Sequence, residues 1–100
     1  MKENNLETLG MKILIVDDNL TNLDVLLRTL SERGYELSVA TDGEMALKIV
    51  SAASPDLILL DIMMPGIDGF ETCARLKSNP ATQNIPIIFL SAKTDPADIV

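Results

Sequence analysis

Hydrophobic residues along the chain alternate between short continuous runs and helical stripes. The continuous runs predict buried strands over residues 11–16, 56–61 and 85–90. Apolar and polar residues alternate over residues 35–39, which predicts an edge strand with one wet face. Between the strands, apolar residues recur three and four positions apart, as in amphipathic helices. The expected helical stripes are Leu23, Leu26, Leu27 and Leu30; Ala46, Ile49, Val50 and Ala53; and Phe70, Cys73 and Ala74.

The boundaries of these helices carry signals of their own. Thr41 and Glu44 have the spacing of a capping box, and Asp68 with Glu71 offers a further helix start. Gly34 stands where a helix end favours a residue that tolerates left-handed geometry. We therefore expect the first helix to end before Gly34, and the next two to begin at Thr41 and Asp68.

Strands and helices alternate with short connections, which predicts an α/β fold with a parallel sheet covered by helices on both faces. The 100 residues are enough for one small domain. Residues 1–10 are mostly polar and are expected to form a flexible tail or linker, so the domain is expected to span residues 11–100.

Charge and composition exclude several functions. The net charge of −7 argues against nucleic acid or an anionic membrane as a direct partner. The chain has no histidine, which excludes Ser-His-Asp and Cys-His catalysis within it. A single cysteine, Cys73, rules out an internal disulfide and favours a reducing, cytoplasmic location. No apolar run approaches the roughly 18 residues of a membrane span.

Polar side chains stand at the ends of three predicted strands. Asp17 and Asp18 end the first strand, Asp61 ends the strand over residues 56–61, and Ser91 follows the last strand. If these strands are neighbours in the sheet, the side chains converge at its carboxyl edge. Carboxylates that lie so close repel one another, and Mg²⁺ would relieve the repulsion. A carboxylate beside a metal-held phosphoryl group can also act as a nucleophile and form an aspartyl-phosphate.

Two enzyme classes share parts of this chemistry. A nucleotide-binding fold would need a glycine-rich turn after the first strand, and the sequence there, DDNLTN, has no glycine. A Mg²⁺-dependent phosphatase or phosphotransferase of the haloacid-dehalogenase type also uses an aspartyl-phosphate. That type places a second aspartate two residues after the nucleophile, whereas this chain has Met63 there.

The motifs VDD at residues 16–18, DIMMPGIDG at residues 61–69 and FLSA at residues 89–92 closely resemble the receiver domain of two-component response regulators and hybrid kinases. The resemblance covers residues 11–100. It implies a flavodoxin-like, doubly wound parallel sheet with strand order 2-1-3-4, lacking the family's fifth strand and fifth helix.

The resemblance also implies a role for each site residue. Asp61 would be the phosphoacceptor, and Ser91 would be the switch hydroxyl. Asp18 would bind Mg²⁺ directly, Asp17 directly or through water, and Met63 through its backbone carbonyl. The phosphoryl donor would be a histidine kinase or a histidine phosphotransfer domain, and the parent protein would carry an output domain.

This chain departs from the family at its C-terminal end. The lysine at the end of the family's fifth strand has no counterpart, and Lys93 is expected to aim differently. Residues 85–90, IPIIFL, would form an uncharged edge strand through which copies of the chain could associate. The alternative function is therefore a phosphorylation-incompetent receiver fragment that acts as an interaction or assembly unit.

Overall fold

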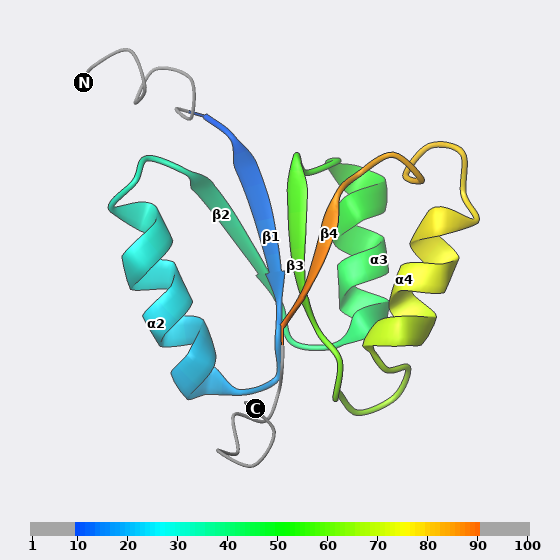
Figure 1. Ribbon diagram of the computed structural model, residues 1–100, viewed down its shortest axis with the longest axis horizontal. Coiled ribbons are helices and arrows are strands. Elements are labelled where there is room, and N and C mark those ends of the chain that lie inside the picture. Colours follow the sequence, from blue (N-terminus) through cyan, green and yellow to red (C-terminus); the bar gives the residue numbers. More distant parts are fainter. Residues whose placement is uncertain (1–9, 91–100) are drawn as a thin grey trace, which may run out of the picture.

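A four-stranded parallel sheet forms the middle layer of the structure, a computed structural model that describes residues 10–90. The strands follow the order β2-β1-β3-β4 across the sheet (Figure 1). Their bounds are Lys12–Val16 for β1, Glu36–Ala40 for β2, Leu57–Asp61 for β3 and Ile87–Leu90 for β4. The α/β class and the strand order 2-1-3-4 are thereby confirmed.

Helices cover both faces of this sheet. α2 (Leu20–Ser31) lies on one face, and α3 (Gly43–Ala52) and α4 (Gly69–Lys77) lie on the other (Figure 1). Each face has its own apolar core because the strands are buried on both sides. The core beneath α3 and α4 comprises Leu14, Val16, Ala40, Ala46, Val50, Ile58, Leu60 and Leu76, and the core beneath α2 comprises Ile13, Ile15, Leu23 and Leu59.

The helix boundaries are partly as predicted. Asp68 is the N-cap of α4, and its carboxylate accepts a hydrogen bond from the backbone N–H of Glu71 at 2.8 Å. Gly34 has a φ of 87°, as expected after the first helix. The predicted start of α3 at Thr41 is wrong by one residue. Asp42 is the N-cap there, because its extended backbone and its carboxylate, 2.7 Å from the Met45 nitrogen, satisfy the first turn.

The predicted buried face of α4 is wrong for Phe70 and Ala74. Phe70 is 58% exposed and packs beside Phe89 of β4, with ring centroids 5.3 Å apart. Thr72 takes the buried position because its hydroxyl donates to the carbonyl of Asp68 at 2.8 Å and is thereby satisfied. The residues of α4 that are buried are Gly69, Thr72 and Leu76.

A glycine explains why Thr72 can be buried. Gly43, the first residue of α3, lies so close that a Cβ there would collide with the Thr72 hydroxyl and the Ile67 side chain. The first turns of the two helices therefore lie in close contact. Ala53 was also expected on the buried stripe of α3, but it is exposed because the helix ends at Ala52 and Ala53 is its C-cap.

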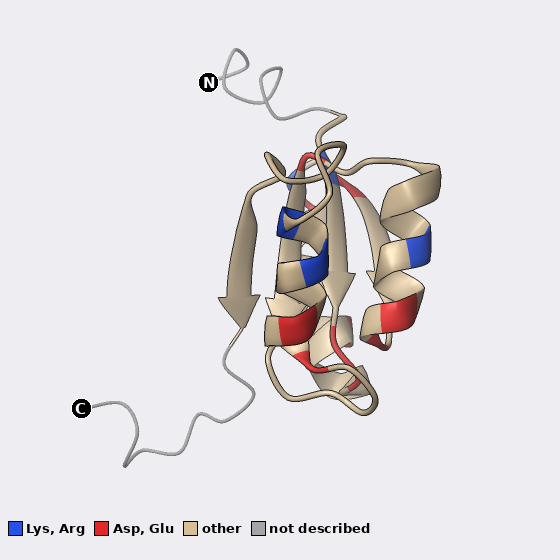
Figure 2. Cartoon of the chain, turned by 90° about the vertical axis from the view of Figure 1, so that its right-hand side faces the viewer, with Lys and Arg blue, Asp and Glu red and all other residues tan. Residues whose placement is uncertain are grey.

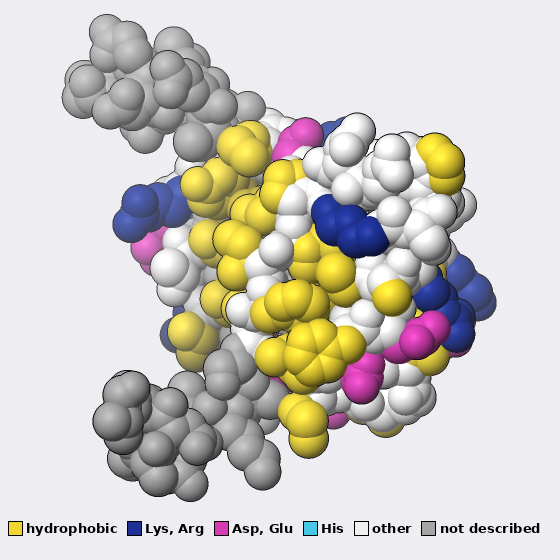
Figure 3. All heavy atoms as spheres, turned by 45° about the vertical axis from the view of Figure 1, so that its right-hand side comes forward, with side chains coloured by type: hydrophobic (Ala, Val, Ile, Leu, Met, Phe, Trp, Pro, Cys, Tyr) yellow, Lys and Arg dark blue, Asp and Glu magenta, His cyan; other side chains and the backbone are white. Residues whose placement is uncertain are grey.

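β4 lies at one edge of the sheet, as predicted for the strand IPIIFL. It begins later than expected because the N–H of Ile85 donates to Thr82 in a turn, and Pro86 has no N–H. Ile88 is 52% exposed and Phe89 is 39% exposed. Figure 3 shows hydrophobic side chains gathered in a band across this side of the molecule. Among residues 10–90, no helix is long and apolar enough to cross a membrane.

Candidate functional site

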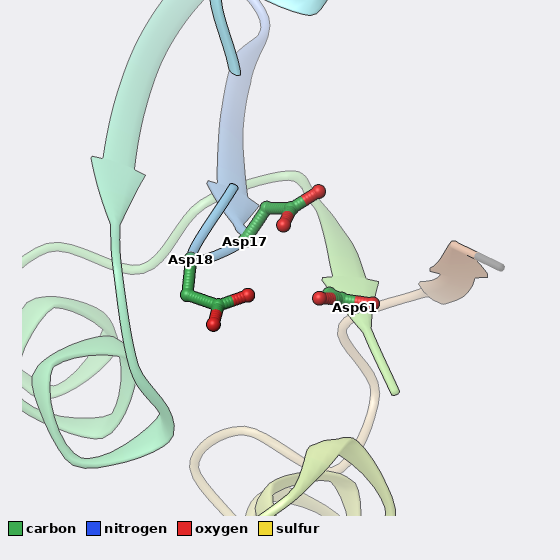
Figure 4. Close-up of side chains that lie close together, drawn as sticks. All are labelled: Asp17, Asp18 and Asp61. Carbon is green, nitrogen blue, oxygen red and sulfur yellow. The ribbon is translucent and has the colours of Figure 1, made fainter. Parts of the chain in front are cut away.

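Three carboxylates meet where β1 and β3 end. These parallel strands are neighbours, and Val16 of β1 pairs with Leu60 of β3. Asp17, the residue after β1, therefore lies next to Asp61, the last residue of β3. Figure 4 shows Asp61 pointing across to Asp17 and Asp18. One carboxylate oxygen from each of the three lies within 4.8 Å of the others. Convergence at the carboxyl edge, predicted from the strand ends, is confirmed for these three residues.

The first turn of α2 holds the carboxylate of Asp17. The backbone N–H of Asn19 donates to its Oδ1 at 2.9 Å, and the side-chain amide of Asn22 donates to its Oδ2 at 3.3 Å. Asp17 is 2% exposed, so these two donors replace water that the carboxylate has lost. Sequence reasoning missed both asparagines. The available signal was their position two and five residues after a strand-end aspartate.

The loop after β3 fixes Asp61 in a similar way. The backbone N–H of Met63 lies 3.4 Å from Asp61 Oδ1, and the N–H of Gly69 donates to the carbonyl of Ile62 at 2.8 Å. A Cβ on Gly69 would collide with the backbone carbonyl oxygen of Asp61. The N-terminus of α4 therefore packs directly against the backbone that carries Asp61, which only glycine permits.

Crowding of like charges changes the acidity of this site. Burial, and secondly the charge of Asp17, raise the pKa of Asp61 from 3.8 to about 6, although the N–H of Met63 opposes the shift. Near neutral pH the cluster is thus anionic at an energetic cost. Oxygen ligands at this spacing and charge suit a hard divalent cation, which would convert the repulsion into attraction. The donor set therefore fits a hard divalent cation of the kind to which Mg²⁺ belongs.

The surrounding turns add to the negative charge. Figure 2 shows the acidic positions of α3 and α4 in the turns nearest the carboxyl ends of the strands, with basic positions farther along both helices. These acids are Glu44 and Glu71, each in the first turn of its helix. Both belong to ion pairs with Arg75, whose guanidinium lies 3.5 Å from Glu44 and 3.0 Å from Glu71.

The remaining predicted site residues are less constrained. Met63 lies in the loop two residues after Asp61. Its side chain is 59% exposed and therefore contributes little to the packing of this loop. Its carbonyl stays a predicted metal ligand. Ser91, the predicted switch hydroxyl, and Lys93 lie outside the described residues.

Comparison with known proteins agrees with this geometry. The family model described as "Response regulator receiver domain" matches residues 13–100. The response regulator PleD of Caulobacter vibrioides is 44% identical over 84 residues, which are 84% of this chain and 18% of PleD. The chain thus spans about a fifth of that relative's length.

Solved structures share the fold as well. The N-terminal domain of a response regulator receiver protein from Methanoculleus marisnigri is 46% identical, with a TM-score of 0.79 over 82% of this chain and 67% of that one. The phosphorylated cyanobacterial phytochrome response regulator RcpA is 32% identical, with a TM-score of 0.79 over 90% of this chain and 71% of that one. The family match over residues 13–100, the shared fold and the three clustered aspartates lead to one conclusion: the chain belongs to the response regulator receiver domains of two-component signalling.

Proposed function

We propose that the chain accepts a phosphoryl group on Asp61, with Mg²⁺ held by Asp17, Asp18 and Asp61. The observation that carries the proposal is the cluster of three carboxylates at the carboxyl ends of β1 and β3. RcpA, which shares the fold, was crystallised in a phosphorylated form. With a pKa of about 6, Asp61 is ionised and nucleophilic at neutral pH even before a cation binds.

The proposed reaction is an in-line displacement at phosphorus. A carboxylate oxygen of Asp61 forms a bond to phosphorus while the bond from phosphorus to the donor's imidazole nitrogen breaks. The electron pair of the broken bond stays on that nitrogen, which takes a proton from water. Bound Mg²⁺ supplies positive charge that offsets the charge of the carboxylates and of the phosphoryl oxygens. The chain is in this account a substrate that assists its own phosphorylation, rather than an enzyme with turnover.

The other site residues complete the proposal. The backbone carbonyl of Met63 would be a further metal ligand, because its residue follows Asp61 in the loop beside the cluster. The hydroxyl of Ser91 would bind a phosphoryl oxygen and act as the switch. The partners we propose are a histidine kinase or a histidine phosphotransfer domain as donor, and an output domain in the parent protein. We also propose a cytoplasmic location, with residues 1–10 as a tail or linker and residues 11–100 as a receiver domain without the fifth strand and helix.

Intact mass after incubation with Mg²⁺ and acetyl phosphate tests the acceptor. We expect the wild-type chain to gain one phosphoryl group and Asp61→Asn to gain none. Asp56→Asn is a matched control, because Asp56 lies just before the opposite end of β3 and is exposed. It should be phosphorylated as the wild type is. A folded wild-type sample that binds Mg²⁺ but gains no phosphoryl group would contradict the proposal.

The exposed edge of β4 favours a second candidate, an assembly unit that is not phosphorylated. β4 carries no charged residue, and its Ile88 and Phe89 side chains are exposed. Such an edge can pair with the β4 of a second copy. Sedimentation over a range of concentrations tests this candidate. The candidate would be supported if the wild-type chain associates and Ile88→Lys abolishes the association. The control is Val25→Lys, a change at a 57% exposed residue of α2, which should have no effect. A monomer at all concentrations would refute it.

A further inference from the structure

Asn22 is the one side chain of α2 that the structure shows bonded to the acidic cluster among the described residues. Its amide donates to Oδ2 of Asp17 at 3.3 Å, and the other carboxylate oxygen, Oδ1, accepts from the backbone N–H of Asn19 at 2.9 Å. Both oxygens of the buried carboxylate are therefore restrained by the beginning of a single helix. Together these two donors fix the plane of the carboxylate.

The cap of α2 does not need the side chain of Asn22. Asn19 is the N-cap, and its side-chain oxygen accepts the backbone N–H of Asn22 at 3.0 Å. Asn22 thus serves the cap through its main chain, and its side-chain amide is free to bond Asp17.

The orientation of Asp17 matters because the cluster is tight. Three carboxylate oxygens lie within 4.8 Å of one another, so a small rotation of Asp17 changes where a cation can sit. Groups that hydrogen-bond to metal ligands commonly contribute about 10- to 100-fold to metal affinity. Asn22 is exposed and its bond is long, which places it at the lower end of that range.

We propose that Asn22 is a positioning residue of the metal site: its amide holds Asp17 in the orientation that a divalent cation requires. The inference rests on the metal-binding part of the proposed function and is independent of phosphorylation. It makes the affinity for Mg²⁺ depend on the first turn of α2, an element that contributes no ligand itself.

Isothermal titration of the full chain with Mg²⁺ tests the inference. Asn22→Leu keeps the branching and size of the side chain but removes the donor, and we expect it to weaken Mg²⁺ binding about tenfold. Asn22→Gln keeps an amide and should recover part of the affinity. The control is Thr21→Val, an isosteric polar-to-apolar change at the preceding exposed residue, which should bind as the wild type does. In metal-free buffer, Asn22→Leu should melt somewhat lower than the wild type because Asp17 loses a donor, so its Mg²⁺ affinity is measured at a temperature where both chains are folded.

A spectroscopic measurement separates positioning from stability. In heteronuclear NMR spectra, the side-chain NH₂ resonances of Asn22 should shift when Mg²⁺ is added and when Asp17 is replaced by Asn. Mg²⁺ affinity of Asn22→Leu within twofold of the wild type would overturn the inference and leave the proposed function intact. Failure of the folded wild-type chain to bind Mg²⁺ would overturn both.

Discussion

Replacing Asp61 with asparagine should stabilise the metal-free protein even though it removes the proposed acceptor. The pKa of Asp61 is about 6 in the folded chain against an ordinary 3.8. Each pKa unit corresponds to about 1.4 kcal/mol, so ionisation of Asp61 costs the fold about 3 kcal/mol at neutral pH. The introduced asparagine would carry no charge, and its amide could donate to Asp17. For a domain of this size the gain corresponds to an increase in Tm of roughly 12–24 °C.

The effect should depend on pH in a defined window. Below pH 3.8 the carboxyl group of Asp61 is protonated in the folded and the unfolded chain, so its ionisation costs nothing. Between pH 3.8 and about 6 the unfolded chain loses this proton while the folded chain retains it, so wild-type stability falls as pH rises. Above pH 6 the cost is constant. The advantage of Asp61→Asn should therefore be full at about pH 7.5 and absent near pH 3.5.

Thermal melting in EDTA, followed by circular dichroism, measures this difference. Asp24→Asn removes the same charge from an exposed residue of α2 and should change the unfolding free energy by less than about 0.5 kcal/mol. Added Mg²⁺ should stabilise the wild type more than Asp61→Asn and so reduce the gap between them. If Asp61→Asn melts no higher than the wild type at this mildly alkaline pH without metal, the reasoning from burial and like charge is wrong.

Four substitutions test the packing, capping and ion pairs around the site by urea unfolding. Gly69→Ala should lower the free energy of unfolding by about 3 kcal/mol, because the new methyl group meets the backbone carbonyl of Asp61. Gly66→Ala is the control: its methyl group meets open space, and only the φ of 77° should cost about 1 kcal/mol. Equal losses for the two variants would contradict the clash at Gly69. Asp42→Ala should lose about 1 kcal/mol with the cap of α3; no loss would show that the cap is not used. Arg75→Ala should leave the urea midpoint nearly unchanged, since its ion pairs are exposed, and a clear loss of stability would contradict this expectation.

The location of the site's acids could be predicted from the sequence, because each acid stands at the end of a strand and the strand ends share one edge of the sheet. Asp17 and Asp61 each follow an uninterrupted apolar run, and parallel strands bring such ends to one edge. The contacts that restrain these acids could not be predicted in the same way. The bond from Asn22 to Asp17 depends on how the first turn of α2 lies against the end of β1, which hydrophobic periodicity does not encode.

The buried face of α4 shows the same limit. Hydrophobicity alone places Phe70 inside and Thr72 outside, whereas the structure has the reverse. The outcome depends on two local facts: a glycine at position 43 admits the threonine, and the carbonyl of Asp68 accepts its hydroxyl as well as its backbone N–H. Hydrophobic periodicity measures neither of them. The N-cap of α3 was misplaced for a related reason, since Thr41 and Asp42 are both good caps and only the backbone decides between them.

The uneven distribution of charge along the molecule has a consequence for encounter rates. The aspartate cluster and the acidic first turns of α3 and α4 lie at one end of a chain with a net charge of −7. A small anion that diffuses toward Asp61 meets a repulsive field, whereas a cation is drawn in. Rising ionic strength screens this field within about 10 Å. Salt should therefore speed the approach of a free anionic phosphate compound to Asp61 and slow that of a basic protein surface, so the field at this end of the molecule selects among molecules before any of them touches it.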